Sequence, residues 1–183
     1  MSDSGNRIKS EARAWTAGRM LVQARQRLEE AQRLCEYWQH GGDGGYLLRL
    51  LAFEILLKAL HLVTVGPPKR SHSYVELMGA LPLEYRNRIW SSAAVAPGVP
   101  HDAALHNKEH LLKTFSKNFV DIRYPYDKYT GDSTEEYHAK GARWIAAGAP
   151  TEEADFTYYP SELGGLTQAI QQEVEMWLSD QDA

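Results

Sequence analysis

An arginine followed by two tyrosines and an aspartate forms the clearest candidate site in the sequence: Arg123, Tyr124, Tyr126 and Asp127. A guanidinium presents a planar fork of donors that matches the oxygens of a phosphate. The tyrosines offer aromatic faces on which a base, or the guanidinium itself, can stack. In the structural alternative, Arg123 is held in an ion pair by Asp127 or by Glu54. The segment therefore predicts either a phosphate site or an ionic tie at a helix end.

A second group consists of His106, Glu109 and His110, which match the inverted zinc-protease pattern His-x-x-Glu-His. On a helix, histidines four residues apart lie on one face and can share a zinc ion while the glutamate activates water. Such a site also needs a glutamate ligand from a second helix, and the glutamates downstream lie in a stretch with little periodicity. We expect a solvated helix face with no metal and no cofactor; the alternative is a metal-dependent hydrolase that uses these residues.

A third group is basic and consists of Lys69 and Arg70 with Arg86 and Arg88. These residues suit the backbone of a nucleic acid, because each neutralised phosphate releases counterions. An ordinary charged loop and a solvated helix face are the alternative. The net charge of −4 argues against nonspecific binding to polyanions, but it divides into +4 over residues 1–70, +1 over 71–123 and −9 over 124–183. The folded chain can therefore still present a basic face.

The elements that must position these groups are all predicted to be helices. Apolar residues at spacings of three and four predict a long first helix, and a run that is apolar on nearly every side predicts a central one. The predicted ranges are 6–39, 46–65, 73–80, 82–95, 103–124 and 137–147, with a last helix that is capped by Ser161. The sequence thus predicts one all-α domain over residues 1–183, a helical bundle with an irregular acidic insertion at about 126–159.

Several residues set the expected boundaries. The glycine run 41–45 is expected to end the first helix, and Asp102 is expected to be the N-cap of the helix that carries Arg123. Ser73 and Glu76 match a capping box. Pro125 forces the residue before it out of helical geometry and therefore fixes the end of that helix.

Within the central helix, Glu54 and Lys58 have the favourable order for an ion pair four residues apart, and His61 lies on the same stripe.

Four short stretches of the chain together form a further pattern. They are the apolar run 47–62 with its Glu54 and Lys58, the turn Ser71-His72-Ser73-Tyr74, the stretch from Asn118 to Asp127, and Tyr158-Tyr159-Pro160 before the last helix. In these stretches the chain resembles the HEPN superfamily, a group of prokaryotic and eukaryotic helical-bundle proteins. The resemblance covers about residues 46–127 and 158–178. It implies a bundle of four or five helices that forms a homodimer across its polar helix.

Many HEPN proteins are metal-independent endoribonucleases of toxin–antitoxin, abortive-infection and CRISPR systems, and their active sites resemble Arg-x4-6-His, contributed by both subunits. Mapped onto this chain, the arginine is Arg123 and a polar residue of the motif is Asp127. The histidine falls where the chain has Lys128, Tyr129 and Thr130, and His138 lies too far along. The chain therefore departs from the motif at its proton-transferring residue.

That departure favours binding over cleavage. Attack by a ribose 2′-hydroxyl needs a group that exchanges a proton near neutral pH, as imidazole does and as lysine and tyrosine ordinarily do not. His72 can compensate only if the fold brings it close to Arg123. We therefore expect a HEPN-like RNA- or nucleotide-binding protein, related to toxin–antitoxin or phage-defence systems, with a cognate antitoxin or other partner protein.

In that prediction Arg123 holds the phosphate and Tyr124 or Tyr126 stacks. Glu54 and Lys58 orient the site, with Lys69 and Arg70 beside it, and His72 and Asp127 are the further catalytic candidates. The competing prediction is a noncatalytic homodimeric scaffold.

The expected location is the cytoplasm, without membrane association. The only cysteine is Cys35, which excludes a disulfide framework and fits a reducing compartment. The first residues lack the apolar core of a signal peptide. The most apolar stretch, 46–65, carries Arg49, Glu54, Lys58 and His61, too many polar groups for a membrane span.

Overall fold

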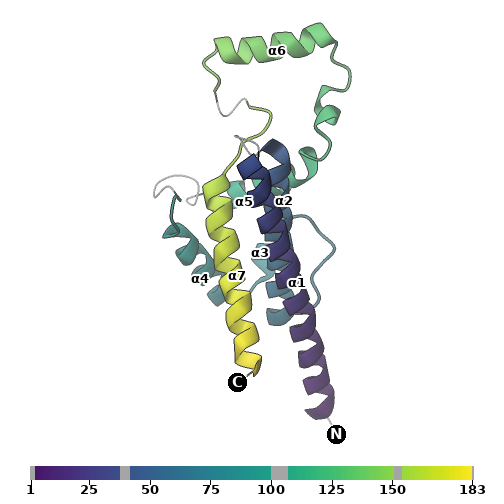
Figure 1. Cartoon of the computed structure of the whole chain (residues 1–183), viewed down its shortest axis with the longest axis vertical. Coiled ribbons are helices and arrows are strands. Elements are labelled where there is room, and N and C mark those ends of the chain that lie inside the picture. The colour runs from purple at the N-terminus through teal and green to yellow at the C-terminus, as the bar shows by residue number, and fades with distance from the viewer. Residues whose placement is uncertain (1–2, 38–41, 100–106, 151–153, 183) are drawn as a thin grey trace.

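The computed structural model of the protein describes residues 3–37, 42–99, 107–150 and 154–182 (Figure 1). All regular structure in these ranges is helical, which confirms the predicted all-α class. The elements are, in chain order, α1 (Asp3–Tyr37), α2 (Gly42–Thr64), α3 (Tyr74–Ala80), α4 (Leu83–Ala94), α5 (Lys108–Asp121), the 3₁₀ turn η2 (Pro125–Tyr129), α6 (Thr134–Ala146) and α7 (Pro160–Asp182). Within the described ranges, no helix has both the length and the apolar character to cross a lipid bilayer.

Helix α2 lies at the centre of the bundle. It packs against α1, α3, α5 and α7, while α4 packs on α7, and α1 and α7 run antiparallel along one side (Figure 1). Its buried side chains point in all directions, as the sequence predicts for a central helix. The ring of Phe53 contacts Tyr74 of α3 and Phe115 of α5, with ring centroids 5.1 and 5.9 Å away. These contacts bring α3 and α5 to one face of α2, where the candidate site lies.

The first residue of α2 differs from the prediction. The helix begins at Gly42 rather than at Tyr46, so most of the glycine run belongs to it. The Cβ position of Gly45 lies 3.4 Å from the Cys35 sulfur and 3.6 Å from the Ala31 carbonyl oxygen of α1. The absence of a side chain at Gly45 therefore lets α1 and α2 approach closely.

Other helix starts also need correction. Helix α5 is capped by Asn107, whose side chain accepts a hydrogen bond from the His110 backbone N–H at 3.0 Å, and it ends at Asp121. The predicted cap Asp102 lies outside the described residues. Helix α7 starts at Pro160, which places Ser161 inside its first turn.

Of two possible capping boxes, at the starts of α3 and α6, only the second forms completely. Ser73 accepts from the Glu76 N–H, but the Glu76 carboxylate accepts from the Ser71 hydroxyl at 3.2 Å, so only half of the predicted box exists. A complete box of Ser133 and Glu136 opens α6, three residues earlier than predicted.

Residues 125–150 and 154–159 belong to an arm that leaves the bundle after α5 and returns before α7. It carries η2 and α6, so the helix predicted over 137–147 within the irregular stretch exists, with 13 residues, none of them buried. Figure 1 shows α6 lying crosswise beyond the end of the bundle. The base of the arm is tied by the Tyr129 hydroxyl, which donates to the Asp155 carboxylate at 2.6 Å, and by the Lys128 ammonium, 3.7 Å from the centre of the Phe156 ring.

Alkaline pH is expected to destabilise the protein through Tyr46 of α2. Burial raises the pKa of the Tyr46 phenol to about 12. The unfolded chain loses this proton near pH 10, whereas the folded chain keeps it, so the free energy of unfolding falls by about 2 kcal/mol as the pH rises from about 10 to 12. Urea denaturation across this pH range measures the fall. The Tyr46→Phe variant should lack this contribution, and an equal pH dependence in both proteins would contradict the assignment.

Candidate functional site

The carboxylate of Glu54 is the buried centre of the candidate site. Glu54 lies in the middle of α2, where it accepts from the Lys58 ammonium at 2.8 Å and is bound by the His72 ring at 2.9 and 3.1 Å. The predicted Glu54–Lys58 pair is therefore confirmed, and a histidine completes it. A buried charge needs such partners, because burial without them costs several kcal/mol.

His72 lies in the turn between α2 and α3 and has a defined proton arrangement. Both of its contacts with Glu54 are made by Nδ1, and a carboxylate paired with a lysine only accepts hydrogen bonds, so Nδ1 carries a proton. Nε2 makes no hydrogen bond to the described residues, and the side chain is 54% exposed. His72 thus presents Nε2 to the surface while Glu54 holds its other nitrogen.

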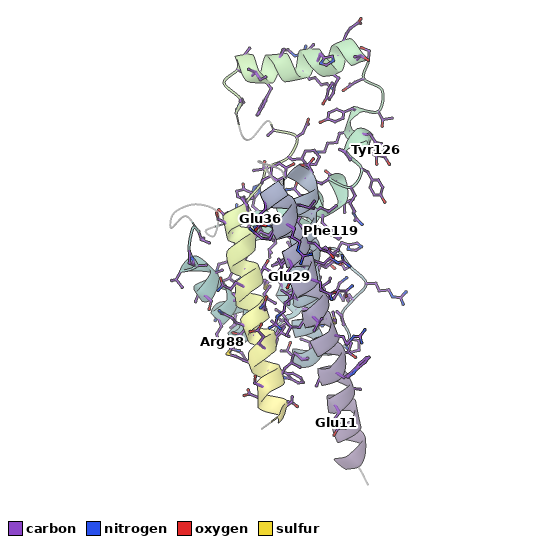
Figure 2. The ribbon with its side chains drawn as sticks, in the orientation of Figure 1. Glu11, Glu29, Glu36, Arg88, Phe119 and Tyr126 are labelled. Carbon is purple, nitrogen blue, oxygen red and sulfur yellow. The ribbon has the colours of Figure 1, made fainter. Side chains whose placement is uncertain are left out.

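The ring of Phe119 joins His72 to Arg123. Phe119 is buried in the last turns of α5 (Figure 2), and its ring centroid lies 5.3 Å from that of His72. The guanidinium carbon of Arg123 lies 4.4 Å from the same ring centre, and Arg123 Nε donates to the Phe119 carbonyl oxygen at 2.7 Å. We call Glu54, Lys58, His72, Phe119 and Arg123 the Phe119 cluster.

Arg123 is exposed and has no ion-pair partner within the described part of the chain. Neither structural alternative is formed, because Glu54 is bound to Lys58 and His72 and because Asp127 is exposed without an ion pair to Arg123. The Nε–carbonyl bond and the phenyl ring fix the base of the guanidinium and leave its two terminal amino groups open to an anion.

Two exposed aromatic rings lie directly after Arg123. Tyr124 and Tyr126 are 48% and 64% exposed and meet edge to face, with ring centroids 6.2 Å apart. Figure 2 shows Tyr126 at the base of the arm, beyond Phe119. Pro125 opens η2, and Tyr124 is non-helical as predicted, but α5 ends at Asp121, three residues before the predicted end at Tyr124. The pair offers a surface for stacking beside the guanidinium.

Tyr74 is buried and packs against Phe119 of the cluster. Its hydroxyl donates to the Leu50 carbonyl at 3.3 Å, and its backbone N–H donates to the Ser116 hydroxyl of α5 at 2.9 Å. Burial, with the nearby Glu54 carboxylate, raises the pKa of the Tyr74 phenol well above its usual value. The phenol therefore stays neutral and adds no second negative charge beside Glu54.

The other predicted groups are arranged differently. Lys69 and Arg70 are exposed in the loop that precedes His72, and neither makes an ion pair with a residue of the described ranges. Arg88 does not join them as a free basic edge, because it makes two bonds to the buried Glu173 carboxylate of α7, at 2.8 and 2.7 Å.

His106 lies outside the described residues, and Glu109 is paired with Lys113 at 2.6 Å. Among the residues that the structure describes, no three histidine, cysteine or acidic side chains form a group that could hold a metal ion.

Two residues of the site were hard to predict from the sequence. His72 was named only as a candidate, and the part played by Phe119 was missed. His72 is 18 residues from Glu54, and the bond between them depends on how the loop after α2 returns. Phe119 carries no chemistry of its own and reads as an ordinary core residue. Its place at the end of α5, one turn before Arg123, is the only signal that it could support the guanidinium.

Comparison of the chain with models of known protein families, with curated proteins and with solved structures gives no match. The function of the chain is therefore inferred from the residues of the Phe119 cluster and from the surface around them.

Proposed function

We propose that this chain is a HEPN-like protein that binds single-stranded RNA through its phosphates at Arg123. The observation that carries the proposal is the guanidinium itself, which is exposed, is held at its base and is free of acidic partners in the described structure. A bidentate contact between such a group and a phosphate is among the stronger polar interactions in water. The motifs shared with the HEPN superfamily support the same ligand.

The surroundings of Arg123 favour a strand over a single nucleotide. Sites for small molecules bury most of their ligand, whereas Tyr124 and Tyr126 present open ring faces to solvent. Strand-binding surfaces combine cations along the backbone with aromatic rings on which successive bases stack. Lys69 and Arg70 are exposed in the loop that leads to His72 and supply two further cations on that loop.

The HEPN resemblance also supports a homodimer, a location in the cytoplasm, and a role beside a partner protein in toxin–antitoxin or phage-defence systems. These parts of the proposal rest on the resemblance alone. A noncatalytic scaffold is the alternative, and it is the result that the binding test below yields if Arg123 has no ligand.

Replacing Arg123 with alanine is expected to weaken RNA binding by about 10- to 100-fold, since one charge-assisted bidentate contact is lost. Fluorescence anisotropy with a labelled 2′-O-methyl oligonucleotide measures this without cleavage of the probe. Raising the salt concentration should weaken RNA binding by the wild-type protein more steeply than RNA binding by the variant, because a phosphate contact releases counterions. A free mononucleotide that competes as well as the strand would assign the site to a nucleotide.

Arg13→Ala is the matched control, because Arg13 is exposed and belongs to the N-terminal half of α1. The N-terminus of α1 lies at the end of the bundle opposite to α6 (Figure 1). The Arg13→Ala substitution removes the same charge and should leave the affinity within about twofold of the wild type. Equal losses of RNA affinity in both variants would mean that the effect comes from the net charge alone. If the wild-type protein binds no strand and no nucleotide, the RNA proposal fails and the scaffold remains.

A further inference from the structure

We propose that a pocket around Arg49 of α2 binds a small carboxylic acid with an aromatic or other apolar body. The pocket lies where the end of α1, the start of α2 and the residues that lead into α7 meet (Figure 1), and its volume is about 400 Å³. We call it the Arg49 pocket, and its lining residues are Cys35, Gly42, Asp43, Tyr46, Arg49, Tyr158 and Pro160. This site does not depend on RNA binding at Arg123.

The guanidinium of Arg49 has no acidic partner in the described part of the chain, although the residue is half-buried. A half-buried cation ordinarily pairs with a carboxylate, as Arg88 does through two bonds to Glu173. Among the described residues, Arg49 makes one hydrogen bond, from Nη2 to the Cys35 sulfur at 3.8 Å, and sulfur is a weak acceptor. A guanidinium has five N–H donors, so most of its binding capacity remains for a ligand.

The charges at the pocket favour a ligand with a single negative charge. The Asp43 carboxylate also lines the pocket, and it accepts a hydrogen bond from the Tyr158 hydroxyl at 2.6 Å. Burial, together with this hydrogen bond, raises the pKa of the Tyr158 phenol well above its usual value, so the phenol stays neutral. One guanidinium can bind a carboxylate through two parallel bonds, whereas a phosphate dianion would bring a second negative charge close to Asp43.

The rest of the wall suits an apolar ligand body. The rings of Tyr46 and Tyr158 meet edge to face, with centroids 4.9 Å apart, and Pro160 lies in the same wall. Sites for small molecules have volumes of about 300–1,000 Å³ and combine a mostly apolar wall with a few polar groups that fix the orientation of the ligand. A carboxylate on Arg49 with its apolar body against the two rings matches that arrangement.

The Arg49 pocket and the Phe119 cluster lie on different sides of α2. Arg49 and Glu54 are five residues apart in this helix, which turns their side chains about 140° away from each other around the helix axis. The end of α1 and the start of α7 border the pocket, whereas α5 and the turn before α3 supply the partners of Glu54 and Phe119 in the cluster. Substitutions at one site should therefore leave the other intact.

The test measures binding of benzoate, phenylacetate and indole-3-acetate, three carboxylic acids of increasing size, to the full chain by ligand-observed NMR. We expect at least one of them to bind with a Kd of about 1 mM or tighter. The neutral amide of that acid should bind at least about 10-fold more weakly, because it cannot form a charge-assisted pair with Arg49.

Arg49→Met should weaken binding of the acid by a similar factor and should bind the acid and its amide equally. This loss of discrimination reports the contact between the guanidinium and the carboxylate even if the variant changes the shape of the pocket. Arg33→Met is the matched control, because Arg33 is exposed on α1 close to Cys35 and does not line the pocket. It removes the same charge and should bind the acid within about twofold of the wild type.

Cys35 reports where the acid binds, because it is the only cysteine of the chain and lines the pocket. The bound acid should slow alkylation of Cys35 by iodoacetamide in the wild-type protein, with a concentration dependence that matches its Kd. In Arg49→Met the same concentration of acid should give little protection.

The carboxylate site is overturned if none of the three acids binds at about 10 mM, or if the amide binds the wild-type protein as tightly as the acid. An acid that binds without changing the alkylation of Cys35 also overturns it, since the ligand then lies elsewhere. Equal losses in Arg33→Met and Arg49→Met would assign the effect to net charge and have the same consequence. Arg123→Ala should bind the acid as the wild type does, so failure of the RNA proposal leaves this site standing.

Discussion

Replacing Phe119 with alanine is expected to lower the free energy of unfolding by about 3–5 kcal/mol, the usual cost of truncating a buried phenylalanine. Phe119 is 4% exposed and forms part of the hydrophobic core, and its ring lies 6.2 Å from that of Tyr74. Truncation leaves a cavity between α3 and α5 and removes the surface under His72 and Arg123. Urea denaturation followed by circular dichroism measures the loss.

The same substitution should also disturb the site, and Phe119→Leu separates the two effects. Leucine keeps most of the buried volume, so it should cost less than about 1.5 kcal/mol if the core adjusts, but it offers no aromatic face to a guanidinium. RNA binding by Phe119→Leu should therefore fall although the protein remains folded. A loss of stability below about 1 kcal/mol in Phe119→Ala would show that the ring is not part of the core.

Helices with a strong apolar pattern could be predicted from sequence, and their ends could be predicted only where backbone chemistry is restrictive. The apolar run of α2 was predicted because periodicity acts locally. Proline geometry correctly placed Pro125 outside the helix before it, but that helix ends three residues before Tyr124, at Asp121. The first residue of α2 was not predicted, because Gly45 is selected by contact with Cys35 on another helix. Residues that are chosen by tertiary contacts leave no local signal.

The candidate site divides in the same way. The Glu54–Lys58 pair follows from helical spacing and was predicted. The exposure of Arg123 was one of two alternatives, and only the structure distinguishes them, since an arginine near acidic residues can pair with them or with solvent. The bond from His72 to Glu54 depends on the path of the loop through residues 65–73, which no periodicity describes. His72, which binds the buried carboxylate of the cluster, was therefore the hardest residue of the site to predict.

Two adjacent glycines of α7 are expected to respond oppositely to the same substitution. A Cβ on Gly165 would lie 3.0 Å from a methyl group of Val99 and 3.1 Å from both the Ala93 carbonyl oxygen and the Ala96 methyl. A Cβ on Gly164 would meet no atom within 4 Å. Gly165 is thus required where α7 crosses the end of α4, and Gly164 is not.

Gly165→Leu should lower the free energy of unfolding by about 3 kcal/mol or more, and Gly165→Ala by a smaller amount, because a backbone carbonyl and two short side chains leave no room for a side chain. Gly164→Ala, with the same gain in helix propensity, should raise it by about 0.5–1 kcal/mol. Thermal and urea denaturation of the three variants measure these differences. Equal effects of alanine at both positions would mean that α4 and α7 do not approach as closely as the structure places them. The position of α4 against α7 would then need revision, whereas the Phe119 cluster, built on α2, α5 and the loop before α3, would be unaffected.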